Sequence, residues 1–366
     1  MAQAFSLPAL RRLSLVEQTA DALRAALQQG TLADPLPGEH QLARQLGVSR
    51  PTLRTALASL VREGRVHRAP GRRTRLAQGR PRPRAAAPAV CVVSPAARLA
   101  VLPEEHPVLQ QMQALFTAKG LRCDEVFDPK LAGPRPEARL DRLTAGRPGT
   151  CWLLLGSTAP IQHWFARQGL VTLVLGTCHA GVSLPAIDLD YRAVGWHAAG
   201  HLLKFGHRQL ALLEPAHPLA GDLACREGFL AYCARSSPPP RVTLLRLPGE
   251  TDGLRDALDR LMARRPRPTA IFCLWQPQSL TVLLQLLSRG WRVPQDVSLL
   301  ARDLHPAMEQ AWPDLAHYGR PVSVLAARAV RLTQGLLAGR KPAALFTSVA
   351  PEFMPGRTLG APLGST

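Results

Sequence analysis

The apolar positions between residues 36 and 66 follow the helical period twice, with a break between the two runs. Leu42 and Leu46 lie one turn apart and share a face, and Gly47 interrupts that helix. A second apolar stripe then recurs at i, i+4 and i+7 through Leu53, Leu57 and Leu60. The pattern predicts two short helices that are joined by a tight turn and packed on a small core.

The start of the second helix carries polar groups that lie off this stripe. Ser49 is a favourable N-cap, and Pro51 falls in the first turn, where its missing N–H costs little. Arg50, Thr52 and Arg54 project from the exposed side near the helix N-terminus. Cationic and hydroxyl groups at this end of a helix are typical of a recognition helix that enters the major groove of DNA.

The flanking segments complete a small domain. Residues 13–29 have an apolar stripe and predict a helix, and Val66 can pair with residues 74–76 as a hairpin around Gly71. Basic residues cluster on that hairpin at Arg68, Arg72, Arg73 and Arg75. Such a wing suits contact with phosphates or the minor groove, and the alternative is a solvated basic loop.

Beyond residue 90, short apolar runs alternate with helical periods. The expected strands are 90–93, 151–156, 170–176, 210–214, 241–247, 270–275 and 297–301. The expected helices are 107–119, 160–168, 191–205, 222–234, 252–263, 277–289 and 322–338. This alternation predicts an α/β fold with two doubly wound, parallel-sheet lobes, in which ligands bind at the carboxyl ends of strands.

The Pro- and Arg-rich segment 79–89 shows no periodicity and predicts a linker. The expected domains are therefore a DNA-binding head over 1–78, this linker, and a two-lobed domain over 90–366, for which the family resemblance given below implies effector binding and dimerisation.

Composition supports this division. The net charge is +19, and residues 1–84 hold 15 Arg against 5 acidic residues, so positive charge is several times denser in the head than in the rest. Such density favours a nucleic acid partner. No apolar run is long enough for a membrane helix and no secretory signal is evident, so we expect a cytoplasmic, nucleoid-associated protein without a membrane partner. The seven cysteines show no CxxC spacing and are interpreted as reduced thiols.

Catalytic and metal motifs are weak, and we expect no catalytic residues, no metal and no cofactor. His197 and His201 stand four apart on a predicted helix, which is a spacing that metal ligands use. No HExxH motif and no third ligand accompany them, so the favoured interpretation is one buried and one exposed histidine.

The run LPGEHQLARQLGVSRPTLRTALASLVREG (36–64) resembles the DNA-binding head of the GntR family of bacterial transcription regulators. The resemblance implies a winged helix-turn-helix in which Arg50, Thr52 and Arg54 contact DNA. We add Ser49, His40, where the family often has a contacting arginine, and the wing residues Arg68, Gly71, Arg72 and Arg73.

Three further runs, 188–213, 225–232 and 268–303, resemble the sensor domain of the LacI/GalR regulators. That resemblance implies two lobes with a hinge and a ligand cleft between them, as in periplasmic sugar-binding proteins. The implied effector-binding residues are Asp190, Arg226, Trp275, Gln276 and Asp303. The sequence departs from the family pattern at Tyr191, Cys225, Trp275, Gln276 and Leu304.

Together these resemblances imply a homodimeric, sequence-specific DNA-binding regulator, a repressor, that binds a double-stranded DNA operator. A small molecule, with a sugar favoured, is expected to modulate operator affinity from the cleft. One alternative is a constitutive DNA-binding regulator whose second domain only dimerises or contacts a protein partner. Another is an enzyme with a DNA-binding head, which no motif supports.

Overall fold

A computed structural model describes residues 14–28, 32, 35–63, 66–67, 74–76, 89–96, 105–247, 251–304, 308 and 312–363. The chain divides into two compact units, residues 1–85 and 86–366. The predicted linker lies outside the described residues except for Ala89, so its boundaries stay a prediction.

The first unit has the predicted helices and hairpin. Its elements are α1 (Leu15–Gln28), α2 (Glu39–Gln45), α3 (Arg50–Arg62), β1 (Val66–His67) and β2 (Arg75–Leu76). Ser49 caps α3, because its hydroxyl accepts the N–H of Thr52 at 3.3 Å. Val66 pairs with Leu76 in an antiparallel ladder, which confirms the expected hairpin. The predicted stripe of Leu53, Leu57 and Leu60 is fully buried in a core of its own.

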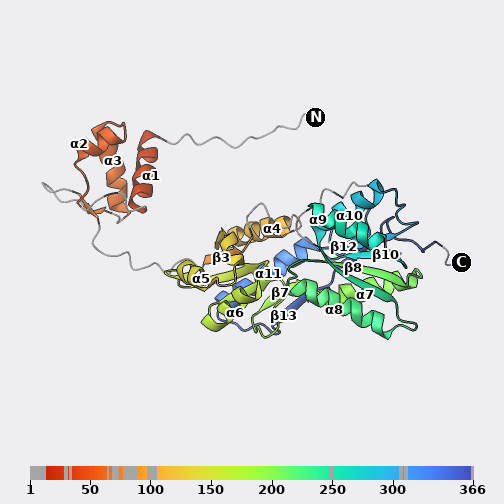
Figure 1. Cartoon of the computed structure of the whole chain (residues 1–366). Coiled ribbons are helices and arrows are strands. Elements are labelled where there is room, and N and C mark those ends of the chain that lie inside the picture. The colour runs from red at the N-terminus through yellow and green to blue at the C-terminus, as the bar shows by residue number, and fades with distance from the viewer. Residues whose placement is uncertain are drawn as a thin grey trace, which may run out of the picture. The chain divides into compact units, whose positions relative to one another are not determined.

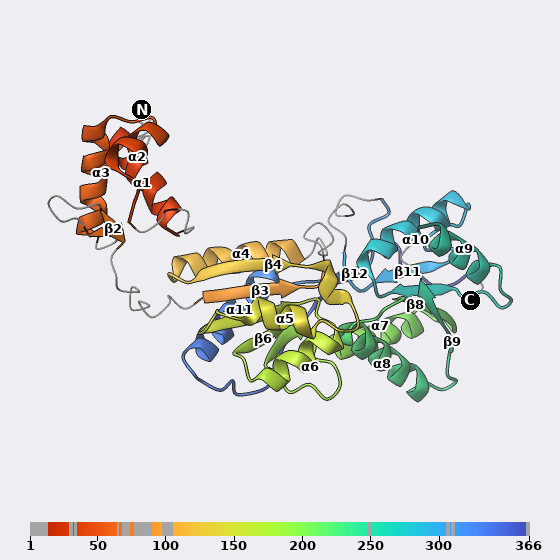
Figure 2. The ribbon, with the colours of Figure 1, turned by 60° about the vertical axis from the view of Figure 1, so that its left-hand side comes forward.

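A six-stranded, all-parallel sheet forms the first lobe of the second unit, with the order β13-β7-β6-β5-β3-β4. Its strands are β3 (Ala89–Ser94), β4 (Arg122–Phe127), β5 (Thr150–Leu155), β6 (Thr172–Leu175), β7 (Ala186–Leu189) and β13 (Phe346–Val349). Helices α4 (Glu105–Ala118) and α11 (Val322–Leu337) cover one face, and α5 (Glu137–Thr144) and α6 (Ala159–Gln168) cover the other (Figure 2). Both faces are covered, as parallel sheets require.

A four-stranded parallel sheet with the order β11-β10-β8-β9 forms the second lobe. Its strands are β8 (Gln209–Pro215), β9 (Arg241–Leu247), β10 (Ala270–Cys273) and β11 (Ser298–Ala301). Helices α7 (Tyr191–Lys204) and α8 (Ala220–Arg235) pack on one face, and α9 (Thr251–Met262) and α10 (Gln276–Ser288) pack on the other (Figure 1). The α/β class and the two doubly wound lobes are thus confirmed.

Helices α7 and α8 approach so closely that glycine is required at the contact. A Cβ atom on Gly195 would lie 1.9 Å from the carbonyl oxygen of Cys225, and one on Gly228 would lie 2.0 Å from that of Arg192. No side chain fits at either position without a backbone shift, so this pair of glycines sets the distance between the helices.

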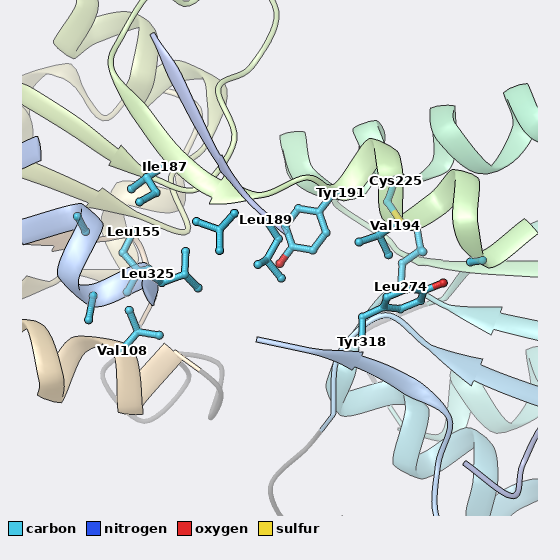
Figure 3. Close-up of a cluster of buried hydrophobic side chains, with 14 of the residues drawn as sticks. Val108, Leu155, Ile187, Leu189, Tyr191, Val194, Cys225, Leu274, Tyr318 and Leu325 are labelled. Carbon is cyan, nitrogen blue, oxygen red and sulfur yellow. The ribbon is translucent and has the colours of Figure 1, made fainter. Parts of the chain in front are cut away.

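The chain crosses between the lobes three times. It passes from β7 to α7 at Leu189–Tyr191, returns from β12 (His317–Gly319) to α11, and passes from β13 to β14 (Glu352–Met354), which pairs with β12. Figure 3 shows Leu189 and Tyr191 between the buried side chains of the two lobes, which form one continuous cluster. The first crossing is therefore part of the hydrophobic core.

The C-terminal segment is fastened to the second lobe by buried polar groups. The fully buried His207 contacts the hydroxyls of Thr269 and Ser298 through its two ring nitrogens, and its Nε2 also lies 2.8 Å from the carbonyl oxygen of Gly360. Thr358 donates to the carbonyl of Leu299 at 2.7 Å. These contacts hold the tail against β11.

Two general features follow from the described residues. All seven cysteines are free thiols. None of the described helices has the length and apolar character needed to cross a bilayer.

Candidate functional site

The exposed end of α3 is the first candidate site. Arg50 and Arg54 are exposed, and Thr52 is half-buried beside them. The hydroxyls of Ser49 and Thr52 lie 2.8 Å apart, so the cap of the helix also fixes the Thr52 side chain. Arg50 and Arg54 lie in the first turns of α3, and the backbone N–H groups at this helix N-terminus favour an anion such as phosphate.

Arg54 is held by an acidic residue that the sequence analysis did not connect with it. Its Nε donates to Oε2 of Glu39 at 2.8 Å, while 53% of the Arg54 side chain stays exposed. Glu39 is the first residue of α2, so this pair ties the two helices together. His40 follows it on the same helix and is exposed. An exposed pair of this kind contributes little stability, and its main effect is to orient the guanidinium.

The structure describes the strands of the predicted wing but not the residues that we expect to contact DNA. The β1–β2 ladder that would carry them is present. Arg68, Gly71, Arg72 and Arg73 lie outside the described residues, so their DNA contacts stay a prediction.

The second candidate site is a cavity of about 780 Å³ in the larger unit. Residues at or just beyond the carboxyl ends of strands in both lobes line it: Ser94, Gly156, Thr177, Pro215, Trp275 and Arg302. This is where doubly wound folds bind ligands.

The charged end of this cavity is built around Arg302. The guanidinium is 6% exposed, its Nε donates to Asp303 at 2.7 Å, and it also pairs with Asp222. It lies over the ring of Tyr191, 4.6 Å from the centroid. Burial by itself would lower the pKa of Arg302, but the carboxylates of Asp303 and Asp222 raise it well above its usual range. The cation is therefore permanent and fully paired.

Tyr191 connects this group to a second crossing between the lobes. Its hydroxyl accepts a hydrogen bond from Nη2 of Arg320 at 2.8 Å. Burial raises the pKa of the Tyr191 phenol, so the hydroxyl stays protonated. Because Tyr191 begins α7 and Arg320 precedes α11, this bond joins two crossing segments at the edge of the cavity.

The first lobe contributes a smaller polar group. Asp188 is buried, and its carboxylate accepts the Thr177 hydroxyl and the Leu189 N–H, each at 2.8 Å. The amide nitrogen of Gln162 donates to the Ser157 hydroxyl at 3.0 Å and to the Thr177 carbonyl at 3.2 Å. These hydrogen bonds hold the Asp188, Thr177 and Gln162 side chains in fixed positions at the cavity edge.

The remaining wall is apolar. Val108, Leu155, Ile187 and Leu325 come from α4, β5, β7 and α11, and Figure 3 shows their side chains gathered together. Each retains 3–7% exposure.

Of the five predicted effector-binding residues, only Trp275 lines this cavity. Asp303 lies behind Arg302 and bonds to it. The effector role of the other three stays a prediction, and their polar groups form hydrogen bonds within the protein. Asp190 caps α7 by accepting the Ala193 N–H at 2.9 Å. Arg226 donates to both oxygens of the buried Glu214. The Gln276 amide donates to the Leu304 carbonyl at 2.8 Å.

The sequence analysis missed the groups that do line the polar part of the cavity, namely Asp188, Asp222, Arg302 and Arg320. Asp222 and Arg302 are 80 positions apart, so no local pattern connects them. The one local signal was that Arg302 directly follows the apolar strand β11.

The histidine pair on α7 lies away from this cavity. Their Nε2 atoms are 3.2 Å apart, and Nδ1 of His197 contacts the Tyr318 hydroxyl at 2.9 Å. Both rings pack against Phe353. Burial lowers the pKa of both His197 and His201. Within the described part of the chain, no group of three or more His, Cys, Asp or Glu is arranged to hold a metal ion.

Comparisons with known proteins divide the chain in the same way. Residues 15–76 match the family described as bacterial regulatory proteins, gntR family, and residues 199–359 match the periplasmic binding protein-like domain. The chain is 22% identical over 290 residues to the arabinose metabolism transcriptional repressor of Geobacillus stearothermophilus, which covers 74% of this chain and 76% of that protein.

Two solved structures show the same fold. A complex of the transcriptional regulator CelR with cellobiose has a TM-score of 0.65 at 18% identity, covering 88% of this chain and 99% of that one. A LacI family regulator from Enterococcus faecium with bound ribose has a TM-score of 0.61 at 20% identity, covering 75% and 99%. The chain is therefore a transcription regulator whose head belongs to the gntR family of bacterial regulatory proteins and whose larger unit is a periplasmic-binding-protein-like domain.

Proposed function

We propose that the chain is a DNA-binding repressor whose operator affinity changes when a small molecule occupies the cavity. The observation that carries this proposal is that one cavity is lined by strand ends of both lobes, in a chain that also has a DNA-binding head. A ligand there contacts both lobes at once, so it favours one arrangement of the lobes over another.

On the DNA side, the chain acts as a cytoplasmic homodimer with one head per half-site of a near-palindromic operator. Arg50 and Arg54 read base edges or phosphates from the N-terminus of α3, with Ser49 and Thr52 beside them and His40 at the start of α2. The wing residues Arg68, Gly71, Arg72 and Arg73 contact the backbone or the minor groove. The support is the exposure of both arginines on α3.

On the effector side, the ligand is a sugar or a molecule that contains one. Asp188 and the Asp222–Arg302 pair offer carboxylate acceptors and an ordered cation, and Trp275 offers a ring face. These groups suit hydroxyls and a pyranose or furanose ring. The names of similar regulators point to the same class, since one is an arabinose metabolism repressor and another was solved as a complex with cellobiose.

Coupling between cavity and head needs a modest free energy. A tenfold change in operator affinity corresponds to about 1.4 kcal/mol of differential ligand binding between two states. The Arg320–Tyr191 bond, which joins two crossing segments beside the cavity, places ligand contacts next to the segments that must bend if the lobes move.

The test uses the full chain and two readouts. A thermal-shift screen against monosaccharides, oligosaccharides and sugar acids should reveal a ligand, because about 100 times its Kd adds roughly 2.7 kcal/mol of stability. Operator sequences selected from random DNA are then titrated with and without that ligand. The proposal predicts at least a tenfold change in operator affinity. A ligand that binds without changing DNA affinity, or a chain that binds DNA and no ligand, favours the constitutive alternative.

A further inference from the structure

The cavity has an apolar side that a sugar alone does not use. Val108, Leu109, Leu155, Ile187, Leu325 and Ala329 all line it, and none has a polar side-chain atom. They come from two helices and two strands of the first lobe, and Figure 3 shows four of them converging. A hydroxyl placed against this surface would lose its hydrogen bonds to water and gain none in return.

The lining also includes polar side chains from both lobes, namely Ser94, Ser157, Gln162, Thr177, Asp188, Tyr191, His217, Asp222, Trp275, Arg302 and Arg320. Asp188 already accepts the Thr177 hydroxyl, and Arg302 is held between two carboxylates. The polar groups of Asp190, Arg226 and Gln276, at positions where the sequence analysis expected sugar contacts, bond to the protein instead. This set of polar side chains suits a hydroxylated ring beside Asp188 and Arg302.

The volume exceeds what one ring fills. Cavities of about 300–1,000 Å³ accommodate drug-sized ligands, and this cavity, at about 780 Å³, lies in the upper half of that range. Six of the residues that bound this space have alkyl side chains. Filling it with apolar groups removes hydrocarbon surface from water on both partners, which is the dominant favourable contribution to such binding.

We propose that the effector is amphipathic: a hydroxylated ring at the Asp188–Arg302 end with an alkyl or aryl substituent against the apolar wall. A glycoside with an apolar aglycone has this chemistry. The inference rests on the proposed function, because it names the ligand class of the same cavity. An effector of this kind would distinguish this chain from a sensor of free monosaccharide.

The first test is a homologous series measured by calorimetry on the full chain. The probes are methyl, butyl and hexyl glycosides of glucose, galactose and arabinose, with phenyl glycosides as the aryl counterpart. Each buried methylene should tighten binding about fourfold, corresponding to about 0.8 kcal/mol. For at least one sugar, the hexyl or phenyl glycoside should bind more than roughly 100-fold tighter than the methyl glycoside. Equal affinities along every series would overturn the inference.

A matched pair of variants locates the effect. Val108→Thr keeps the side-chain shape and puts a hydroxyl on the apolar wall, so the preference for hexyl over methyl should fall roughly tenfold. Val194→Thr makes the same change in a buried helix residue that does not line the cavity, and the ratio should be unchanged. Because the readout is a ratio of two affinities, a general loss of stability cancels. An unchanged ratio in Val108→Thr would contradict the placement of the substituent.

The outcomes separate this inference from the proposed function. If methyl glycosides bind and change operator affinity with no dependence on chain length, the inference fails and the proposed function stands. If binding rises with chain length but operator affinity never changes, the ligand class is right and the regulatory proposal fails. If no glycoside and no free sugar binds, both fail.

Discussion

The head and the cavity present arginine in opposite ways. Arg50 and Arg54 lie on an exposed helix end, and Arg54 has one carboxylate partner at a half-exposed site. Arg302 is buried between two carboxylates and stacked on an aromatic ring. An exposed guanidinium remains available to an incoming phosphate, whereas a buried and paired one holds its surroundings in place. Substitutions in the head should therefore change binding, and substitutions around the cavity should change stability first.

The largest effect is expected where backbone packs on backbone in the second lobe. Gly195→Ala places a methyl group 1.9 Å from the Cys225 carbonyl oxygen, which forces α7 and α8 apart. We expect a loss of more than about 4 kcal/mol in the free energy of unfolding, measured with urea. Gly335→Ala on α11 is the control, because its nearest neighbour is a flexible Arg340 atom at 3.9 Å. That variant should be neutral or up to about 1 kcal/mol more stable.

Arg302→Met tests the buried arginine directly. It removes the buried cation that pairs with Asp222 and Asp303, although Arg320 still lies 3.8 Å from Asp303, and should cost about 3 kcal/mol at pH 7. Arg292→Met removes a surface pair with Asp296 and should leave the melting temperature nearly unchanged. If both variants melt alike, the cation of Arg302 does not stabilise the cavity.

Arg54→Ala tests the exposed arginine. Specific operator binding should weaken by roughly 1–3 kcal/mol if the side chain reads a base, with no change in the melting temperature. Arg62→Ala, at the opposite end of α3, is the matched control and should have a much smaller effect. Equal losses on operator and random DNA would assign Arg54 to the phosphate backbone instead.

The smallest effect concerns pH and the tail of the second lobe. Burial lowers the pKa of His207 below its ordinary value near 6.5, although the Gly360 carbonyl opposes this. The unfolded chain then takes up the proton first, so this stability is present above about pH 6.5 and is lost as the pH falls below it. We expect a loss of at most about 1 kcal/mol between pH 7 and 5.5. His207→Asn should reduce that slope, and an equal slope would exclude His207 as its source.

Local sequence pattern was enough to predict which residues of α3 are exposed, because Arg50, Thr52 and Arg54 all lie on this one short helix. The stripe of Leu53, Leu57 and Leu60 fixes which side of α3 is exposed, and Arg54 follows from it. The strands of the two lobes were harder to predict from the sequence. β4 was missed because its sequence RCDEVF is polar at a sheet edge, and β7 because it has only four residues. A cleft between the lobes was expected, but most of its polar lining residues could not be predicted, because they meet only through the sheet topology, as with Arg302 and Asp222.

The last segments of the chain complete both lobes of the larger unit, and this affects how the protein can fold during synthesis. The first lobe needs α11 and β13, and the second lobe needs β14 and the segment around Thr358. The head has its own core within residues 16–66 and can fold while the ribosome is still translating the sensor. A chain that ends before residue 322 would therefore contain the complete head, whereas both lobes of the larger unit would lack segments that they need. Such a fragment would retain the exposed arginines of α3 and lack the part of the cavity lining that α11 supplies, Leu325 and Ala329.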